Sequence, residues 1–307
     1  MLFIPHKHLY ISGTSYISAD EPDYKEVITD ANSRRRMGRL LKMAVWCGLK
    51  SLDGVPSERV AGIITSTGAG FMKDTISFGS SIFDREETLL NPSPFMQSTF
   101  NTASGYIALI RKIHAYNTTY VQQADGFAAS VIDAAMLLDD AGGGNVALVG
   151  AFDEVTPEVD VIRQRLGLYR VGDAFLPLGE GAAAFLLSAA KPTDVFESAS
   201  VSLHEYGGTS SHSLNGTKDG NAALRFCGLA NLSDLPECAG NQIAELFGIN
   251  AGVNVISCAD HVESLGAFRS LLPVLLCKLI SEQQIPDGYT AIVDNVNDDG
   301  VIILLYK

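Results

Sequence analysis

The chain of 307 residues is 47% hydrophobic and carries a formal net charge of −13. It can therefore bury a large core, as one domain or as two closely packed halves. The negative charge argues against nucleic acid or an anionic membrane as a main partner, because phosphates would be repelled. An acidic carrier protein could still bind through a local basic patch.

The cysteines are scattered without a CxxC pair, which predicts reduced thiols rather than disulfides or a zinc site. They are Cys47, Cys227, Cys238, Cys258 and Cys277. The apolar run at the N-terminus is too short for a signal peptide, and no apolar stretch of about 18 residues follows it. We therefore expect a cytoplasmic protein without a membrane span, a metal or a cofactor.

The first elements are a strand at residues 9–18 and one long helix at residues 33–52 with helical spacing of apolar residues. Arg34, Arg35 and Arg36 stand at the start of that helix, where cations oppose the macrodipole. A contact with a carrier protein or phosphate would explain them. The favoured explanation is a solvated cluster that pairs with Asp20, Glu21 or Glu26.

Residues 60–67 are mostly apolar, as in a strand buried on both faces, and a glycine turn follows them. Residues 91–100 read as a loop that leads into a helix near Asn101. The glycines at 142–144 read as the end of a helix that precedes a strand at residues 146–150.

A strand followed by a polar turn and a helix stands at the centre of the chain. Residues 118–121 are β-branched or aromatic, residues 122–126 form the turn, and Phe127, Val131 and Leu138 mark a buried helical stripe. Many α/β enzymes place a nucleophile at such a junction, since a helix N-terminus stabilises negative charge and lowers a thiol pKa. This turn contains no Cys, Ser or Lys.

Together with this junction, the segments at residues 91–110, 145–154 and 178–188 resemble the β-ketoacyl synthases of the thiolase fold. The family has a Cys at the start of the buried helix. The matching position here is Gln123 or Ala124, depending on where a one-residue gap is placed. Chain-length factors, the inactive partners of type II polyketide ketosynthases, have Gln at this turn.

The resemblance implies an α/β protein with a thiolase-like layered α-β-α-β-α fold from two pseudo-repeated halves. We expect a ketosynthase-like N-terminal half at residues 1–190 and a shortened C-terminal half at residues 191–307, packed as one compact unit.

In the second half, the resemblance puts Asn231 where the first catalytic His of the family would be. His261 is the candidate for the second, without its usual upstream lysine, and His204 and His212 fall outside the catalytic set. The family's glycine-rich loop before the last strand is replaced by residues 294–300. We expect a tight turn there at Asp299 and Gly300, and its carboxylates disfavour an oxyanion.

These losses imply a non-catalytic, chain-length-factor-like subunit for fatty acid, polyketide or aryl polyene biosynthesis. It would shape an acyl tunnel for a complete ketosynthase or pair with itself, with an acyl carrier protein as a further partner. In family dimers the loop matching residues 91–100 lines the neighbour's tunnel, which suggests Met96, Thr99 and Phe100; the alternative is an ordinary loop packed in its own subunit. The strand with Thr119 and Val121 would pair across the two-fold axis.

Two alternatives stay open. The first is an active acyl-carrier-protein synthase or acyltransferase with a relocated nucleophile, Cys258, three residues before His261 and directly after a strand at residues 253–257. Cys is more often simply buried. The second is a homodimeric acyl-binding protein without a catalytic partner.

Overall fold

The computed structural model describes most of the first half and separate segments of the second half. It covers residues 8–18, 20–121, 123–167, 170–171, 174–175, 179–190, 200–202, 225–230, 252–261, 272–293 and 299–306. Asn231, His204 and His212 lie outside the described residues, as do residues 294–298 of the predicted acidic turn.

The first half of the chain builds one part of a mixed sheet. Its strands are β1 (His8–Ile17), β2 (Val60–Ser66), β3 (Tyr116–Tyr120), β4 (Val146–Asp153) and β7 (Gly181–Ser188). They lie in the order β1-β7-β4-β2-β3, so β3 is the terminal strand. β2 is parallel to β3 and β4, whereas β7 is antiparallel to β4 and β1.

The second half continues this sheet. Its strands are β8 (Ser200–Ser202), β9 (Arg225–Ala230), β10 (Val253–Ser257), β11 (Tyr289–Val293) and β12 (Asp299–Tyr306). β8 pairs with both β1 and β12 and so connects the two parts. β10 is parallel to β11, and β12 lies antiparallel to β11 and β9. A separate two-stranded ladder joins β5 (Arg170–Val171) and β6 (Ala174–Phe175).

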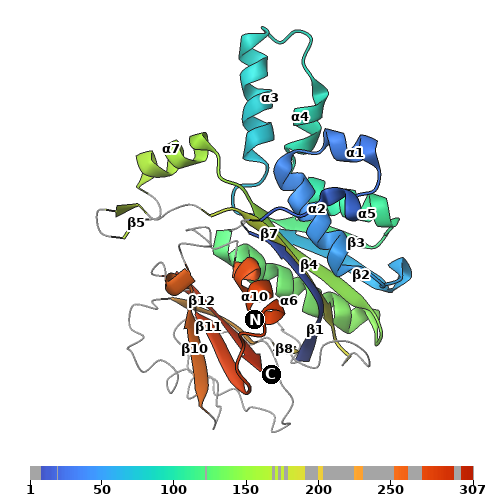
Figure 1. The fold of residues 1–307 in the computed structure, drawn as a ribbon, viewed down its shortest axis with the longest axis vertical. Coiled ribbons are helices and arrows are strands. Elements are labelled where there is room, and N and C mark those ends of the chain that lie inside the picture. The colour runs from blue at the N-terminus through green and yellow to red at the C-terminus, as the bar shows by residue number, and fades with distance from the viewer. Residues whose placement is uncertain are drawn as a thin grey trace.

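The helices cover the sheet in layers (Figure 1). They are α1 (Ala31–Arg36), α2 (Arg39–Ser51), α3 (Met72–Asp84), α4 (Pro92–Gln97), α5 (Thr102–Arg111), α6 (Gln123–Ala141), α7 (Pro157–Leu166) and α10 (Leu272–Ser281). Short 3-10 turns occur at Tyr24–Glu26, Ser57–Arg59 and Cys258–His261. α2 and α5 cover one face of the first part, α6 and α10 lie between the two parts, and α3 and α4 project from one end.

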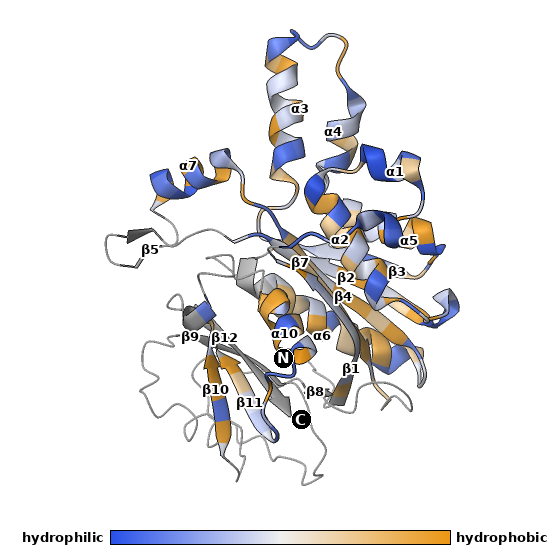
Figure 2. Ribbon diagram, in the orientation of Figure 1, coloured by the Kyte–Doolittle hydropathy of each residue, from blue (hydrophilic) through white to orange (hydrophobic). Residues whose placement is uncertain are grey.

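The central strands β2, β4 and β7 are buried on both faces, as the apolar run at residues 60–67 predicts for β2. Neighbouring residues Ile63 and Ile64 on β2 are both fully buried, one in each of two core clusters on opposite sides of the sheet. On the α6 side, Phe127 meets Phe185 edge-on with ring centroids 5.7 Å apart. Figure 2 shows apolar residues concentrated on the central strands and on α10.

The predicted long helix at residues 33–52 is wrong, because the chain breaks at Met37 and Gly38 into α1 and α2. Gln97 on α4 explains the break: its Oε1 accepts from the Gly38 N–H at 2.8 Å, and its Nε2 donates to the Arg36 carbonyl. A distant side chain thus satisfies backbone groups that a continuous helix would pair internally.

Because of this break, the three arginines stand at the C-terminal end of a helix and not at its start, as was expected. Asp30 caps α1 by accepting from the Ser33 N–H at 2.7 Å, so the three arginines lie in the last turn. Cations at that end stabilise a helix. Glu21 pairs with Arg39 rather than with the cluster, and Arg39 also contacts Glu180 at 2.7 Å.

Two further local expectations are corrected. The predicted loop at residues 91–100 contains α4, which begins where Asn91 Oδ1 accepts from the Ser93 N–H at 3.1 Å. The predicted tight turn at Asp299 and Gly300 is absent, because both residues belong to β12 and lie opposite Ala230 and Leu229 of β9. Pairing with a neighbouring strand overrides the turn preference of these two residue types.

Candidate functional site

The junction between β3 and α6 is shorter than predicted. β3 ends at Tyr120 and α6 begins at Gln123, so the expected turn at residues 122–126 is mostly helix. Gly126 lies in the first helical turn, where a Cβ would be 3.4 Å from the Ser66 Cβ and 3.7 Å from the Tyr120 Cβ. The first turn of α6 thus packs against the ends of β2 and β3.

The first turn of α6 is the place where the chemistry of such a junction would reside. Its backbone N–H groups carry the positive end of the helix dipole, which stabilises an anion or a thiolate. The residues here are Gln123, Ala124 and Asp125, which include no thiol, hydroxyl or amine. Both alternatives for the predicted position, Gln123 and Ala124, lie in this turn, and the backbone alone does not choose between them.

A carboxylate that the sequence reasoning missed ties the strand ends together beside this turn. Asp153, fully buried at the end of β4, accepts from the backbone N–H groups of Gly68 and Ala69 at 2.8 Å each. It also accepts from the Thr67 hydroxyl at 3.0 Å. The Thr67 N–H in turn donates to the Tyr120 carbonyl at 3.0 Å. In the sequence, an Asp at the end of a buried strand is the signal that indicates such a carboxylate.

The other face of β3 carries hydroxyl contacts to its neighbours. Thr119 Oγ1 lies 2.8 Å from Thr65 Oγ1 on β2 and 3.4 Å from Ser104 Oγ on α5. Asn117 donates from Nδ2 to the Ser104 carbonyl at 3.1 Å. These contacts fix the alternation of β3, in which Asn117 and Thr119 point to the α5 side of the sheet.

Residues 14–204 match the model of the β-ketoacyl synthase N-terminal domain. The chain belongs to the β-ketoacyl synthase family. A comparison with curated protein sequences finds no match. The family assignment confirms the resemblance carried by the central junction and by the segments around it.

Solved ketosynthase structures share the fold. The ishigamide ketosynthase/chain length factor is 15% identical, with a TM-score of 0.64 over 97% of this chain and 98% of that chain. The ketosynthase with its chain length factor from Xenorhabdus doucetiae is 12% identical, with a TM-score of 0.55 over 97% and 99%. A type II PKS acyl-carrier protein in complex with its ketosynthase is 14% identical, with a TM-score of 0.62 over 97% and 99%. The expected thiolase-like ketosynthase fold is thereby confirmed.

In this ketosynthase-like chain, the residues suggested for a partner's tunnel lie on the surface. Met96 on α4 is 62% exposed and Phe100 is 44% exposed. Thr99 is also exposed, and its hydroxyl lies 2.8 Å from the Thr102 hydroxyl. The ring of Phe100, however, packs against Gly70 of the same chain, where a Cβ would lie 2.4 Å from Phe100 Cδ1. Both the tunnel-wall interpretation and the alternative of a loop packed in its own subunit stay predictions.

Cys258 and His261, two of the candidate residues from the second half, lie in one turn. β10 covers the predicted strand at residues 253–257, and the 3-10 turn Cys258–His261 follows it directly. Cys258 is buried and His261 is half-buried. Asn231 would follow β9, which ends at Ala230, but Asn231 itself lies outside the described residues.

Two other cysteines serve packing rather than chemistry. Cys47 on α2 and Cys277 on α10 are fully buried, with Sγ atoms 3.4 Å from the Ala182 carbonyl and 3.8 Å from the Ala184 carbonyl. Burial raises the pKa of both thiols, so neither is a thiolate at neutral pH.

Within the described residues, no group of three or more His, Cys, Asp or Glu side chains is placed to hold a metal ion. No helix there is long and apolar enough to cross a bilayer.

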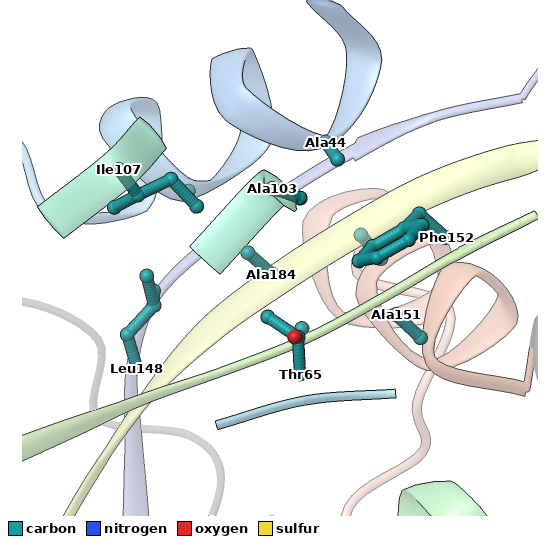
Figure 3. A pocket seen from close by; sticks show the side chains of 11 residues that line it. Ala44, Thr65, Ala103, Ile107, Leu148, Ala151, Phe152 and Ala184 are labelled. Atoms are coloured by element: carbon teal, nitrogen blue, oxygen red, sulfur yellow. The ribbon is translucent and has the colours of Figure 1, made fainter. Parts of the chain in front are cut away.

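A small cavity lies between the α2–α5 layer and the sheet (Figure 3). Its volume, counted as the space open to the centre of a water molecule, is about 10 Å³, which is roughly the minimum for one water. It is lined by Ala44, Gly48, Thr65, Ala103, Ile107, Leu148, Gly150, Ala151, Phe152, Ala183 and Ala184. An acyl chain does not fit this volume, so we interpret the cavity as a packing gap and not as a tunnel.

We expect Glu154→Gln to stabilise the protein at neutral pH. Glu154 is buried at the base of α3, where its carboxylate accepts from the Lys73 N–H at 3.3 Å. Burial raises its pKa, and the nearby Asp74 raises it further. A raised carboxyl pKa costs stability above that pKa, and this cost vanishes below the ordinary value of about 4.3. Glutamine keeps an acceptor oxygen for Lys73 without the charge.

Urea unfolding of both proteins near pH 7.5 and near pH 4 measures this effect. The variant should exceed the parent in free energy of unfolding at the higher pH and match it at the lower pH. A variant that is less stable at both values would contradict the prediction.

Proposed function

We propose that this chain is a non-catalytic, chain-length-factor-like subunit that pairs with a complete ketosynthase and shapes its acyl tunnel. The carrying observation is the first turn of α6: it follows β3 as the nucleophile turn of the family does, but it contains Gln123, Ala124 and Asp125. The product class we propose is a fatty acid, polyketide or aryl polyene.

Condensation through a thioester requires a thiolate to hold the growing chain and donors to stabilise the enolate and the oxyanion. The proposed position of the thiolate holds no sulfur, and the resemblance puts Asn231 where the family has one imidazole. Removing the nucleophile alone abolishes covalent catalysis. The fold is that of the solved ketosynthases, and we propose that the surfaces that bind partners are kept with it.

The pairing surface we propose is the open edge of β3. In a parallel strand the N–H and C=O of one residue point to the same side, and successive residues alternate. The Tyr120 carbonyl accepts from Thr67 beside β2, so Tyr120 faces β2, and Asn117 and Thr119 direct their backbone N–H groups to the edge. No described strand pairs there.

Apolar side chains around this edge support its burial by another chain. Exposed large apolar residues lie on β3 and on the two helices that flank it, α5 and α6. They are Leu109 on α5, Tyr116 and Val121 at the two ends of β3, and Met136 on α6. An open strand edge with apolar neighbours is a typical association surface. The exposed Met96, Thr99 and Phe100 on the nearby α4 segment would then face the partner, and we propose that they form a wall of its acyl tunnel.

An acyl carrier protein is a further proposed partner, and α1 is its proposed docking site. Arg35 and Arg36 are exposed in the last turn of α1, whereas Arg34 donates to the carbonyl of Ile28 and, at 3.4 Å, of Thr29. An acidic carrier would complement this local positive charge despite the net charge of −13.

Intact mass spectrometry after incubation with an acyl-carrier-protein thioester tests the absence of catalysis. We expect no acyl adduct on the wild-type chain.

Co-expression with a complete ketosynthase, followed by size-exclusion chromatography, should yield a heterodimer. An adduct that is lost in Cys258→Ser would instead establish the alternative acyltransferase, for which the shared turn of Cys258 and His261 is the favouring observation. A homodimer that binds acyl chains without any synthase would establish the second alternative.

A further inference from the structure

The α6 surface beside the open edge of β3 carries two aspartates, on either side of Met136. Asp133, Met136 and Asp140 follow one another at spacings of three and four residues, so they lie on one helical face. Asp133 Oδ2 accepts from the hydroxyls of Tyr116 and Tyr120 on β3, at 2.9 and 3.1 Å, which places this face at the edge. Met136 is 46% exposed and Asp140 is exposed.

No cation on α6 offsets these carboxylates. The helix has four Asp and no Lys, Arg or His over its 19 residues. The nearest cations in sequence, Arg111 and Lys112, stand at the end of α5, which covers the opposite face of the sheet. Arg59 lies beyond the C-terminal end of α6, where its Nε donates to the Gly144 carbonyl at 2.6 Å. The Arg111 guanidinium donates hydrogen bonds to the carbonyls of Leu52, at 3.0 Å, and Val55. Tyr116 and Tyr120 add no positive charge beside Asp133, because a phenol is neutral. Burial and this carboxylate raise the pKa of both, to about 12 for Tyr120, so they stay protonated donors.

The geometry of edge pairing determines what this acidic face meets. Antiparallel pairing of β3 with a second β3 across a two-fold axis normal to the sheet keeps both α6 helices on the same face of the extended sheet. The two helices then lie side by side. In a pair of identical chains, carboxylates would therefore approach carboxylates.

We infer that the β3 edge selects a different chain, whose matching helix carries Lys or Arg opposite Asp133 and Asp140, over a second copy of this chain. This inference rests on the proposed pairing function and names the charge of its partner. A strand ladder forms through backbone groups that every chain has, so the charges beside it can distinguish one partner from another. Like charges brought together at an interface disfavour the wrong partner, and opposite charges favour the right one.

A cationic version of the same chain tests this inference. The variant Asp133→Asn/Asp140→Lys keeps an acceptor oxygen for the two tyrosines and replaces two negative charges by one positive charge. Differently tagged wild-type and variant chains are mixed, and native mass spectrometry counts the three possible dimers. We expect the squared amount of the mixed dimer, divided by the product of the two homodimer amounts, to exceed its statistical value by about tenfold at low ionic strength. This excess should shrink as salt screens the charges.

Glu158→Lys on α7 is the matched control, because it reverses one charge on an element far from β3 (Figure 1). It should pair with the wild type only in the statistical ratio. A statistical ratio for the cationic variant, a mixed-dimer excess that salt does not change, or no dimer of any kind would overturn the inference.

A proline at Thr119 separates failure of this inference from failure of the proposed function. If Thr119→Pro abolishes pairing while the cationic variant shows no preference, β3 is the interface but its charge does not choose the partner. If Thr119→Pro leaves pairing intact, the β3 edge is not the interface, and both proposals about it fall.

Discussion

Thr119→Pro is expected to weaken association with a ketosynthase partner by at least about a hundredfold, or ~3 kcal/mol. The Thr119 N–H points to the open edge of β3, so proline removes a ladder donor and places its ring where the partner strand would lie. The ring does not meet β2, because that strand is on the other side. Co-purification and analytical ultracentrifugation measure the loss.

Thr119→Val is the control for this experiment. Valine keeps the backbone N–H but removes the hydroxyl that lies 2.8 Å from Thr65 Oγ1, a loss that the proline variant shares. We expect Thr119→Val to cost some stability and to retain association. Equal weakening by valine and proline would assign the effect to the hydroxyl and not to strand pairing.

Gln123→Cys or Ala124→Cys is expected to create a reactive thiol. Either residue lies in the first turn of α6, where the helix dipole lowers a thiol pKa and enriches the thiolate. At neutral pH we expect the faster of the two variants to react with iodoacetamide about tenfold faster than an ordinary exposed cysteine. The faster variant also identifies which residue occupies the family's nucleophile position.

Met136→Cys provides the ordinary exposed cysteine on the same helix, away from its N-terminus. The wild-type chain supplies the background from its native thiols. We expect no condensing activity in any variant, because the resemblance puts Asn231 where the family has a catalytic imidazole. If neither new cysteine outpaces Met136→Cys, the first turn of α6 does not activate a nucleophile.

Short-range patterns in the sequence predicted several elements well. The strand at residues 253–257 coincides with β10, and the run at residues 60–67 with β2, because apolar residues bounded by polar or glycine turns mark a strand. The helical stripe of Phe127, Val131 and Leu138 is buried as predicted. The spacing of motifs around this stripe was sufficient to identify the family before any contact was known.

Contacts between distant residues decided the rest. Gln97 takes backbone groups at Arg36 and Gly38 and so splits a helix whose apolar spacing continues through the break. Pairing with β9 turns Asp299 and Gly300 into strand residues. The bonds of Asp153 to the Gly68 and Ala69 N–H groups join residues more than 80 positions apart.

The sequence by itself determined the family, the main strands and the absence of a thiol at the start of α6, because each depends on residue identity and local spacing. The resemblance already implied an open edge at the strand of Thr119 and Val121. Only the tertiary structure gave the strand order that ends at β3 and placed Asp133 beside that strand. Those features depend on strand order and on hydrogen bonds between elements, which local patterns do not encode.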